Sequence, residues 1–171
     1  MSRFAVGPMT SCLSPDELVI AVTFPKTARR SGGALCEFSR RHGDSAIVGV
    51  AAVVELTPAG AIARAALGFA GAGPVPSRAP AAEHMLTGQP ANMEIFRAAA
   101  SAAVRELDPM QDVQASRAYR QRLVAVVTSQ ALQSATARAR VRAGQCRLRA
   151  SRPEVCVAGS ASHWPGAPGR D

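Results

Sequence analysis

The sequence has few aromatic residues, only one lysine, Lys26, and no long apolar run. Aromatic residues make up 4% of its 171 residues and apolar residues 47%, so alanine, valine and leucine have to fill any core. No apolar stretch reaches the roughly 18 residues that a membrane-spanning helix needs. The start, Met1–Thr10, lacks the basic-then-apolar order of a secretory signal. We therefore expect one cytoplasmic domain, with or without a tail, and no membrane insertion.

Regularly spaced metal ligands are also missing. The cysteines form no C-x-x-C pair, and no histidine stands at zinc-ligand spacing from any of them. Cys36 lies in an apolar, strand-like stretch, where a buried and reduced thiol is the ordinary state. We therefore expect no metal or iron–sulfur site in this chain. The four cysteines are Cys12, Cys36, Cys146 and Cys156.

The chain carries a net charge of +8 at pH 7, but no motif of nucleic-acid-binding proteins accompanies this charge. From Ala139 onward six arginines stand against Glu154 and Asp171, which makes +4, and the other +4 is spread over the longer remainder. Arginine and alanine dominate throughout, a bias typical of a GC-rich genome. The composition requires no polyanionic partner, and we expect no nucleic-acid binding.

Four segments in the first half have the composition of β-strands. The first of them stops at Pro25, which cannot donate to a strand ladder, and the loop Lys26–Gly33 after it is expected to be exposed and mobile. The last two are joined by Thr57–Gly60, which has the residues of a hairpin turn. The predicted strands are Leu18–Phe24, Ala34–Arg40, Ser45–Leu56 and Ala61–Gly71.

Helical patterns follow the strands. A short helix over Ala81–Leu86 is expected to end at Gly88, and Asn92 is expected to cap a helix that runs to about Leu107. Ser116 is expected to cap the last helix. Strands followed by helices predict an α+β fold, with the helices packed on one face of an antiparallel sheet. The apolar positions assigned to one face of the last helix are Tyr119, Leu123, Val126, Val127 and Leu132.

The apolar pattern fails beyond about Arg140. The segment that follows mixes arginine, glycine, serine and proline, and it has too little apolar surface to order itself. We therefore predict a folded domain over residues 1–138 and a disordered basic tail over residues 139–171.

Several short motifs follow one another with the order and spacing of a known domain. They are Phe4-x-x-Gly7-Pro8-x-Thr10 with Leu13-x-Pro15-Asp16-Glu17-Leu18, the run Phe38–Ala51 (FSRRHGDSAIVGVA), Ala66-Leu67-Gly68 with Pro76-x-Arg78-Ala79, and Asp112-x-x-x-Ser116-x-x-Tyr119-Arg120. Together they resemble the C-terminal domain of the FAD-binding medium subunit of molybdenum hydroxylases, the carbon monoxide dehydrogenase and xanthine dehydrogenase family. The resemblance covers about Phe4–Arg138, and it implies a three- to four-stranded antiparallel sheet followed by about three helices.

The resemblance also implies a role in electron transfer. In this oxidoreductase family a large subunit with molybdopterin oxidises the substrate, and electrons pass through [2Fe–2S] clusters of a small subunit to FAD and then to an acceptor. The glycine-rich loops that hold the FAD pyrophosphate belong to an N-terminal half that has no counterpart here. Gly71-Ala72-Gly73 stands before Pro74 and not at a helix start, so it is not a phosphate cradle. We expect the isolated chain to bind FAD poorly and to be inactive.

The resemblance places four residues of this chain at the flavin. Val19 matches a position where an aliphatic side chain packs near the isoalloxazine ring, although an ordinary core valine explains it equally well. Arg41 and Asp44 match a loop beside the reactive edge of the flavin, where Gly43-Asp44 is also good chemistry for a solvated turn. Ile47 follows on the next strand, where it lines the flavin pocket or simply packs in the core. No catalytic residue is expected, because no Ser/His/Asp arrangement is present.

Three functions remain open at this point. The first is the C-terminal part of a flavoprotein subunit that passes electrons from [2Fe–2S] clusters through FAD to an acceptor. The second is a truncated or frameshifted remnant that folds and has no activity. The third is a small interaction module that uses its basic tail.

Overall fold

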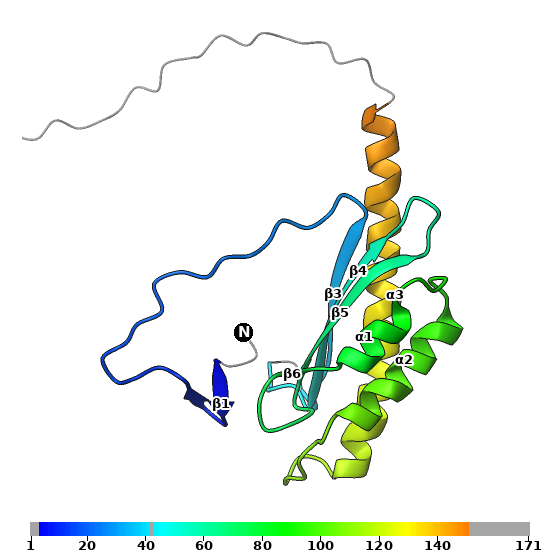
Figure 1. Cartoon of the computed structure of the whole chain (residues 1–171). Coiled ribbons are helices and arrows are strands. Elements are labelled where there is room, and N and C mark those ends of the chain that lie inside the picture. Colours follow the sequence, from blue (N-terminus) through cyan, green and yellow to red (C-terminus); the bar gives the residue numbers. More distant parts are fainter. Residues whose placement is uncertain (1–3, 42, 151–171) are drawn as a thin grey trace, which may run out of the picture.

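The molecule is an antiparallel sheet with three helices on one face (Figure 1). The structure is a computed structural model that describes residues 4–41 and 43–150. The strand order of the main sheet is β3-β4-β5-β6, and each of its strands pairs antiparallel with its neighbour. A separate hairpin of β1 (Ala5–Gly7) and β2 (Thr10–Ser11) precedes it. The main elements are β3 (Ser31–Phe38), β4 (Val48–Leu56), β5 (Ile62–Ala70), β6 (Ser77–Arg78), α1 (Pro80–Leu86), α2 (Met93–Glu106) and α3 (Arg117–Ala150). The predicted fold class is confirmed.

Local signals placed the turn and the caps correctly. In the turn between β4 and β5, the Gly60 amide donates to the Thr57 carbonyl at 3.0 Å, and Gly60 takes a φ of +89°, which favours glycine. The Asn92 side chain accepts from the Ile95 amide at 3.0 Å and begins α2. Gly88, just after α1, has a φ of +81°. The Ser116 hydroxyl accepts from the Tyr119 amide at 3.3 Å and begins α3.

The first predicted strand is wrong. Leu18–Phe24 forms no strand in the structure, and its apolar side chains are exposed, Ile20 at 91% and Phe24 at 78%. Strand propensity is realised only when a neighbouring strand supplies the backbone partners. No such neighbour lies beside this segment among the described residues. Strand β3 also starts earlier than predicted, so that Ser31–Gly33, assigned to an exposed loop, belong to the sheet.

The face of α3 that packs on the sheet differs from the predicted one. Leu123, Val127 and Leu132 are buried as expected, whereas Tyr119 and Val126 are 41% and 54% exposed. The small residues Val124, Ala131, Thr128, Ala135 and Thr136 turn out to form the centre of the buried face. Counting only large apolar residues shifted the predicted face around the helix axis, because alanine and threonine also pack where a helix approaches a sheet closely.

Helix α3 extends beyond the boundary that was predicted at residue 138. Helix α3 continues to Ala150, and Ala139 is fully buried. Only the last turns of α3 run past the end of the sheet in Figure 1, and these turns need no apolar face. Alanine, arginine, leucine and glutamine are strong helix formers even where the helix has no apolar face. Gly144 is the main residue here with a low helix propensity. The remainder of the predicted disordered tail, 151–171, lies outside the described residues.

Candidate functional site

A small polar pocket lies at the turn between β3 and β4. Its volume is about 180 Å³, and three of the four residues predicted from the resemblance line it. The fourth, Val19, does not; it lies in the exposed segment before β3 and is 46% exposed. The structure thus brings one wall of the predicted site together and leaves Val19 outside it. The lining residues are Arg40, Arg41, Asp44, Ser45, Ile47 and Gln114.

The turn itself is held by backbone hydrogen bonds. The Asp44 amide donates to the Arg41 carbonyl at 3.2 Å, and the Ile47 amide donates to the Phe38 carbonyl at 2.8 Å. Gly43 has a φ of +90° with open space around it, so the backbone and not packing requires glycine there. The Asp44 carboxylate is exposed, while Ile47 is 2% exposed and belongs to the core. Ile47 therefore packs in the core and also lines this polar pocket.

The buried side chain of Arg120 joins three segments beneath this pocket. Arg120 is 5% exposed, and its guanidinium donates to the Ile47 carbonyl and to the Gly71 carbonyl, the latter at 3.2 Å. It also donates to Asp112 Oδ2 at 2.6 Å. Its neighbour Tyr119 contacts the ring of Phe38 edge-on, with centroids 6.3 Å apart. These two residues dock the last helix onto the sheet.

The second wall of the pocket is the connector between α2 and α3. Asp112 Oδ1 accepts from the backbone amides of Gln114 at 2.9 Å and Ala115 at 3.0 Å, which fixes the connector in a tight turn. The Arg40 guanidinium donates to the Gln114 carbonyl and ties this turn to the other wall. Sequence reasoning did not single out Arg40 or Gln114 as site residues. The Asp112–Arg120 motif was the available signal, since it brackets the connector.

The hydrogen bond from Arg120 lowers the pKa of the Asp112 carboxyl, and the Ala115 and Gln114 amides lower it further. Because the pKa in the folded chain lies below 3.8, the carboxylate stabilises the fold above that pH and loses this effect as the pH falls through its folded pKa. We therefore expect Asp112→Asn to lower the urea midpoint at neutral pH, by an amount that shrinks in acid. Urea titrations at neutral pH and near pH 3 measure this, and Asp16→Asn serves as the control. A pH-independent difference would contradict it.

The pocket at the β3–β4 turn is too small to enclose a flavin. A cavity of about 180 Å³ is smaller than the roughly 300–1,000 Å³ of sites that enclose a small molecule. Gly71 is taken up by packing, because a Cβ there would stand 2.2 Å from the Ile47 carbonyl oxygen. Gly71 thus has a structural role, since it allows the close approach of the Ile47 carbonyl.

The part of the chain that the structure describes, residues 4–41 and 43–150, offers neither a metal-binding cluster nor a membrane-spanning helix. No group of three or more histidine, cysteine, aspartate or glutamate residues within it could hold a metal ion. Nor does this part contain a helix that is long and apolar enough to cross a bilayer. Cys12 is exposed and Cys36 partly buried, and both are free thiols.

Two known proteins are similar to this chain over most of its length. The 6-hydroxypseudooxynicotine dehydrogenase complex subunit alpha of Paenarthrobacter nicotinovorans is 36% identical over 140 residues, which cover 82% of this chain and 47% of that protein. A putative xanthine dehydrogenase FAD-binding subunit of Escherichia coli K12 is 28% identical over 81% of this chain and 48% of its own length. The chain therefore spans about half the length of the curated relatives it matches.

A solved structure and a family model agree with these relatives. The carbon monoxide dehydrogenase from Hydrogenophaga pseudoflava superimposes with a TM-score of 0.75 at 28% identity, over 80% of this chain and 47% of that one. Residues 33–135, more than half of the chain, match the family model of the CO dehydrogenase flavoprotein C-terminal domain. The chain belongs to the family of CO dehydrogenase flavoprotein C-terminal domains.

Proposed function

We propose that this chain is the C-terminal part of a flavoprotein subunit that passes electrons from [2Fe–2S] clusters through FAD to an acceptor in a molybdenum hydroxylase complex. The observation that carries the proposal is the pocket at the β3–β4 turn. Arg41, Asp44 and Ile47 were chosen from the resemblance alone, and all three line this one cavity. An ordinary solvated turn does not require a buried arginine fixed beneath it, as Arg120 is here.

FAD, when bound, would supply the electron-transfer chemistry, and the residues of this chain would set its surroundings. The Asp44 carboxylate is exposed at the mouth of the pocket, where its charge would act on the flavin edge. Arg40 and Arg41 would offset that charge from the same turn. Arg120 would hold the Ile47 carbonyl, and so the start of β4, at a constant position. A rigid wall keeps these charges in place while electrons move.

The proposed partners are an FAD-binding N-terminal half, a large subunit that carries molybdopterin and a small subunit that carries the iron–sulfur clusters. The names of the relatives support multi-subunit assembly, since one is a dehydrogenase complex subunit and another a FAD-binding subunit. The exposed apolar segment Leu18–Phe24 supports a missing neighbour as well. Its β-branched residues suit a strand, and a partner that offers a strand edge would complete it.

The proposal can be tested in a chimera, in which this chain replaces the matched half of the Escherichia coli FAD-binding subunit within its complex. We expect Asp44→Asn to change the rate of flavin reoxidation about tenfold, which corresponds to about 1.4 kcal/mol in activation free energy. Reduction of the complex by its substrate should keep its rate, because that step occurs in another subunit. Stopped-flow measurements of the two half-reactions separate these effects.

Two controls make this test specific. Glu94→Gln removes an exposed carboxylate from the start of α2, away from the turn, and should leave both half-reactions unchanged. In the isolated chain Asp44→Asn should alter the free energy of unfolding by no more than about 0.5 kcal/mol, because Asp44 is exposed. Equal reoxidation rates in Asp44→Asn and wild type would reduce Asp44 to a turn residue. A chimera that folds without retaining FAD would favour the inactive remnant.

A further inference from the structure

The outer edge of strand β3 has no strand beside it. Within the described part of the chain, β3 pairs only with β4. The Arg30 carbonyl accepts from the Leu56 amide of β4, and backbone groups point alternately to either side along a strand. Every second residue of β3 therefore directs its amide and carbonyl away from β4. Among these outward groups of Gly33, Leu35 and Glu37, only the Gly33 carbonyl has a partner in the described chain, Arg138 at 2.6 Å.

This edge lacks the features that usually protect an exposed strand. Proteins protect such edges with proline, lysine, a short strand or a covering element. β3 is eight residues long, and its sequence SGGALCEF contains neither proline nor lysine. Glu37 is its single charged residue. An edge of this length and composition readily accepts a further strand.

The segment Leu18–Phe24 has the composition of such a strand. Its seven residues include no charge, glycine or proline, and most of them are β-branched. Its large side chains are exposed, with Ile20 at 91% and Phe24 at 78%. Leu18, Ile20, Val22 and Phe24 would share one side of an extended strand. The same molecule thus contains a strand-forming segment without a neighbour and a strand edge without a neighbour.

The segment does not reach the edge of its own β3. The Ser31 amide and hydroxyl both donate to the Ala28 carbonyl, at 3.1 Å and 2.6 Å, and hold the chain in a turn just before β3. From this turn the segment arcs away from the sheet in Figure 1 and does not run back along β3. The edge of β3 is therefore open to a segment from another molecule.

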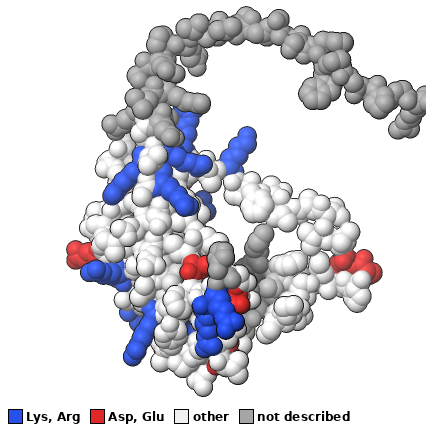
Figure 2. All heavy atoms as spheres, turned by 180° about the vertical axis from the view of Figure 1, so that it is seen from behind, with Lys and Arg blue, Asp and Glu red and all other residues white. Residues whose placement is uncertain are grey.

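A groove beside this edge suits the side chains of the segment. Its volume is about 480 Å³, and it lies between the start of β3 and α3. Two glycines leave its floor without side chains, and Val141, which is 60% exposed, forms an apolar wall. In Figure 2, a space-filling view from behind, arginines gather over the last described turns of α3. Guanidinium groups stack on aromatic rings, so a groove flanked by arginines suits Phe24. The lining residues are Gly32, Gly33, Ala137, Arg138, Val141 and Arg142.

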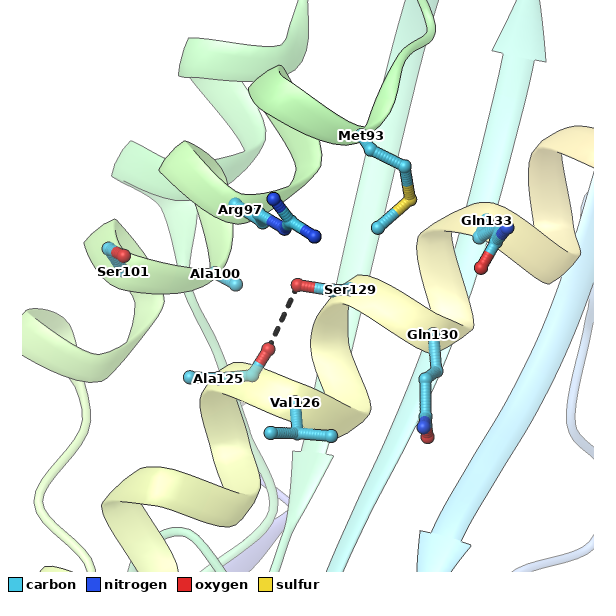
Figure 3. A pocket seen from close by; sticks show the side chains of 9 residues that line it. All are labelled: Met93, Arg97, Ala100, Ser101, Ala125, Val126, Ser129, Gln130 and Gln133. Carbon is cyan, nitrogen blue, oxygen red and sulfur yellow. Dashed lines mark hydrogen bonds between the residues drawn. The ribbon is translucent and has the colours of Figure 1, made fainter.

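The groove between α2 and α3 has a different chemistry. Its volume is about 360 Å³. Figure 3 shows Arg97 and Met93 of α2 facing α3 across it, where Ser129 donates to the Ala125 carbonyl at 3.0 Å. The backbone groups of two helices are already bonded within each helix, so this groove cannot extend a sheet. The edge of β3 is the surface that fits an extended apolar segment.

We propose that two copies of this chain form a dimer in which Leu18–Phe24 of each copy adds as a strand to the β3 edge of the other. The exchange is reciprocal, so one two-fold interface uses both unpaired elements of each copy. Leu18–Phe24 and Gly32–Phe38 are equally long, and antiparallel pairing with Ala21 opposite Leu35 aligns them completely. In this register Ala21 and Leu35 exchange two backbone hydrogen bonds.

The same register matches the groove and the charges. Phe24 falls opposite Gly32, beside the groove between β3 and α3. Asp16 falls opposite Arg40, so an acidic end of the added strand meets a basic end of β3. The inference does not depend on the proposed function. It applies to the chain on its own, since an FAD-binding half would compete for Leu18–Phe24.

Analytical ultracentrifugation of the full chain tests the dimer. We expect a dimer that dissociates on dilution. Ala21→Pro should weaken it about tenfold or more, because proline cannot donate to a strand ladder. Ala21→Val keeps the donor and favours a strand, so it should preserve the dimer. Ala21 is exposed, so the single copy should fold equally well in both variants. A chain that stays monomeric at every concentration, or a dimer that Ala21→Pro leaves intact, would overturn the proposal.

Hydrogen exchange locates the contact. The outward amides of Leu35 and Glu37 should exchange at least several-fold more slowly at high protein concentration than at low, and Ala21→Pro should abolish this difference. The amide of Val126, inside α3, should exchange equally at both concentrations. Protection of Leu35 and Glu37 that is independent of concentration would mean that the segment folds back onto its own β3, which would overturn the proposal. Neither measurement involves the flavin, so a failure here is distinct from a failure of the electron-transfer role.

Discussion

Replacing Gly32 with alanine is expected to destabilise the chain by about 3 kcal/mol, the upper part of the range for overpacked cores. Gly32 lies in β3 where α3 crosses it. A Cβ at this position would stand 2.1 Å from the Ala135 carbonyl oxygen and 2.4 Å from the Ala139 amide nitrogen. Both atoms are backbone, so no side chain can rotate away and α3 has to move. Urea unfolding followed by far-UV circular dichroism measures the loss.

The adjacent residue provides a matched control. Gly33 belongs to the same strand but lies on the face of the sheet away from the helices, where the nearest atoms to an added Cβ are 3.8 Å and 3.9 Å away. Gly33→Ala should therefore be neutral or slightly stabilising, because glycine in a strand is about 0.5–1 kcal/mol less favourable than alanine. If the two substitutions have the same effect, the contact between β3 and α3 is not as close as described.

The second large effect is expected from Arg120→Met, with a loss of about 2–3 kcal/mol in the free energy of unfolding, as for removal of charged hydrogen-bond donors. Methionine keeps much of the apolar volume but cannot donate to the Ile47 and Gly71 carbonyls or to Asp112. The Ile47 carbonyl is then left buried without this donor. The free energy of unfolding of Arg120→Lys should lie between those of the wild type and Arg120→Met, because one ammonium cannot reproduce the fixed fork of a guanidinium.

Hydrogen exchange distinguishes a local loss of the Arg120 hydrogen bonds from a general loosening of the fold. In Arg120→Met, amides of the β3–β4 turn and of the connector at Asp112 should exchange faster, while the hairpin turn at Gly60 should not. Arg122→Met removes an exposed arginine two positions further along α3 and should leave stability and exchange unchanged. A uniform rise in exchange across the sheet would mean that Arg120 supports the whole core and not the site.

The parts of the fold that could be predicted are those determined by nearby residues. The turn at Thr57–Gly60 and the cap at Asn92 depend on contacts within a few positions, and both were predicted correctly. Leu18–Phe24 was predicted as a strand because its composition is right, yet strand formation depends on a neighbour that local sequence does not specify. The end of α3 was placed too early because a helix that leaves the sheet has no apolar period to detect.

The candidate site could likewise be predicted only where its residues lie close together in the sequence. Arg41, Asp44 and Ile47 lie within one turn, so a motif that covers the turn finds all three together. No local motif predicts the hydrogen bond from Arg120 to the Ile47 carbonyl, because the two residues are 73 positions apart. Gln114 contributes through its backbone carbonyl, and a main-chain role leaves no trace in residue type. Val19 lies in the exposed segment before β3 and does not line the pocket.

The close crossing of β3 by α3 has a consequence for the order in which the chain acquires its structure. Arg138 donates to the Gly33 carbonyl at 2.6 Å across a separation of 105 positions. Hairpins such as β4–β5 close over a few residues, whereas this contact has to close a long loop, which is entropically costly and slow. During synthesis the inner face of the sheet stays bare until the residues beyond Ala139 have left the ribosome. The nascent sheet therefore passes through a stage in which its inner, apolar face is uncovered, the stage at which such chains aggregate and engage chaperones.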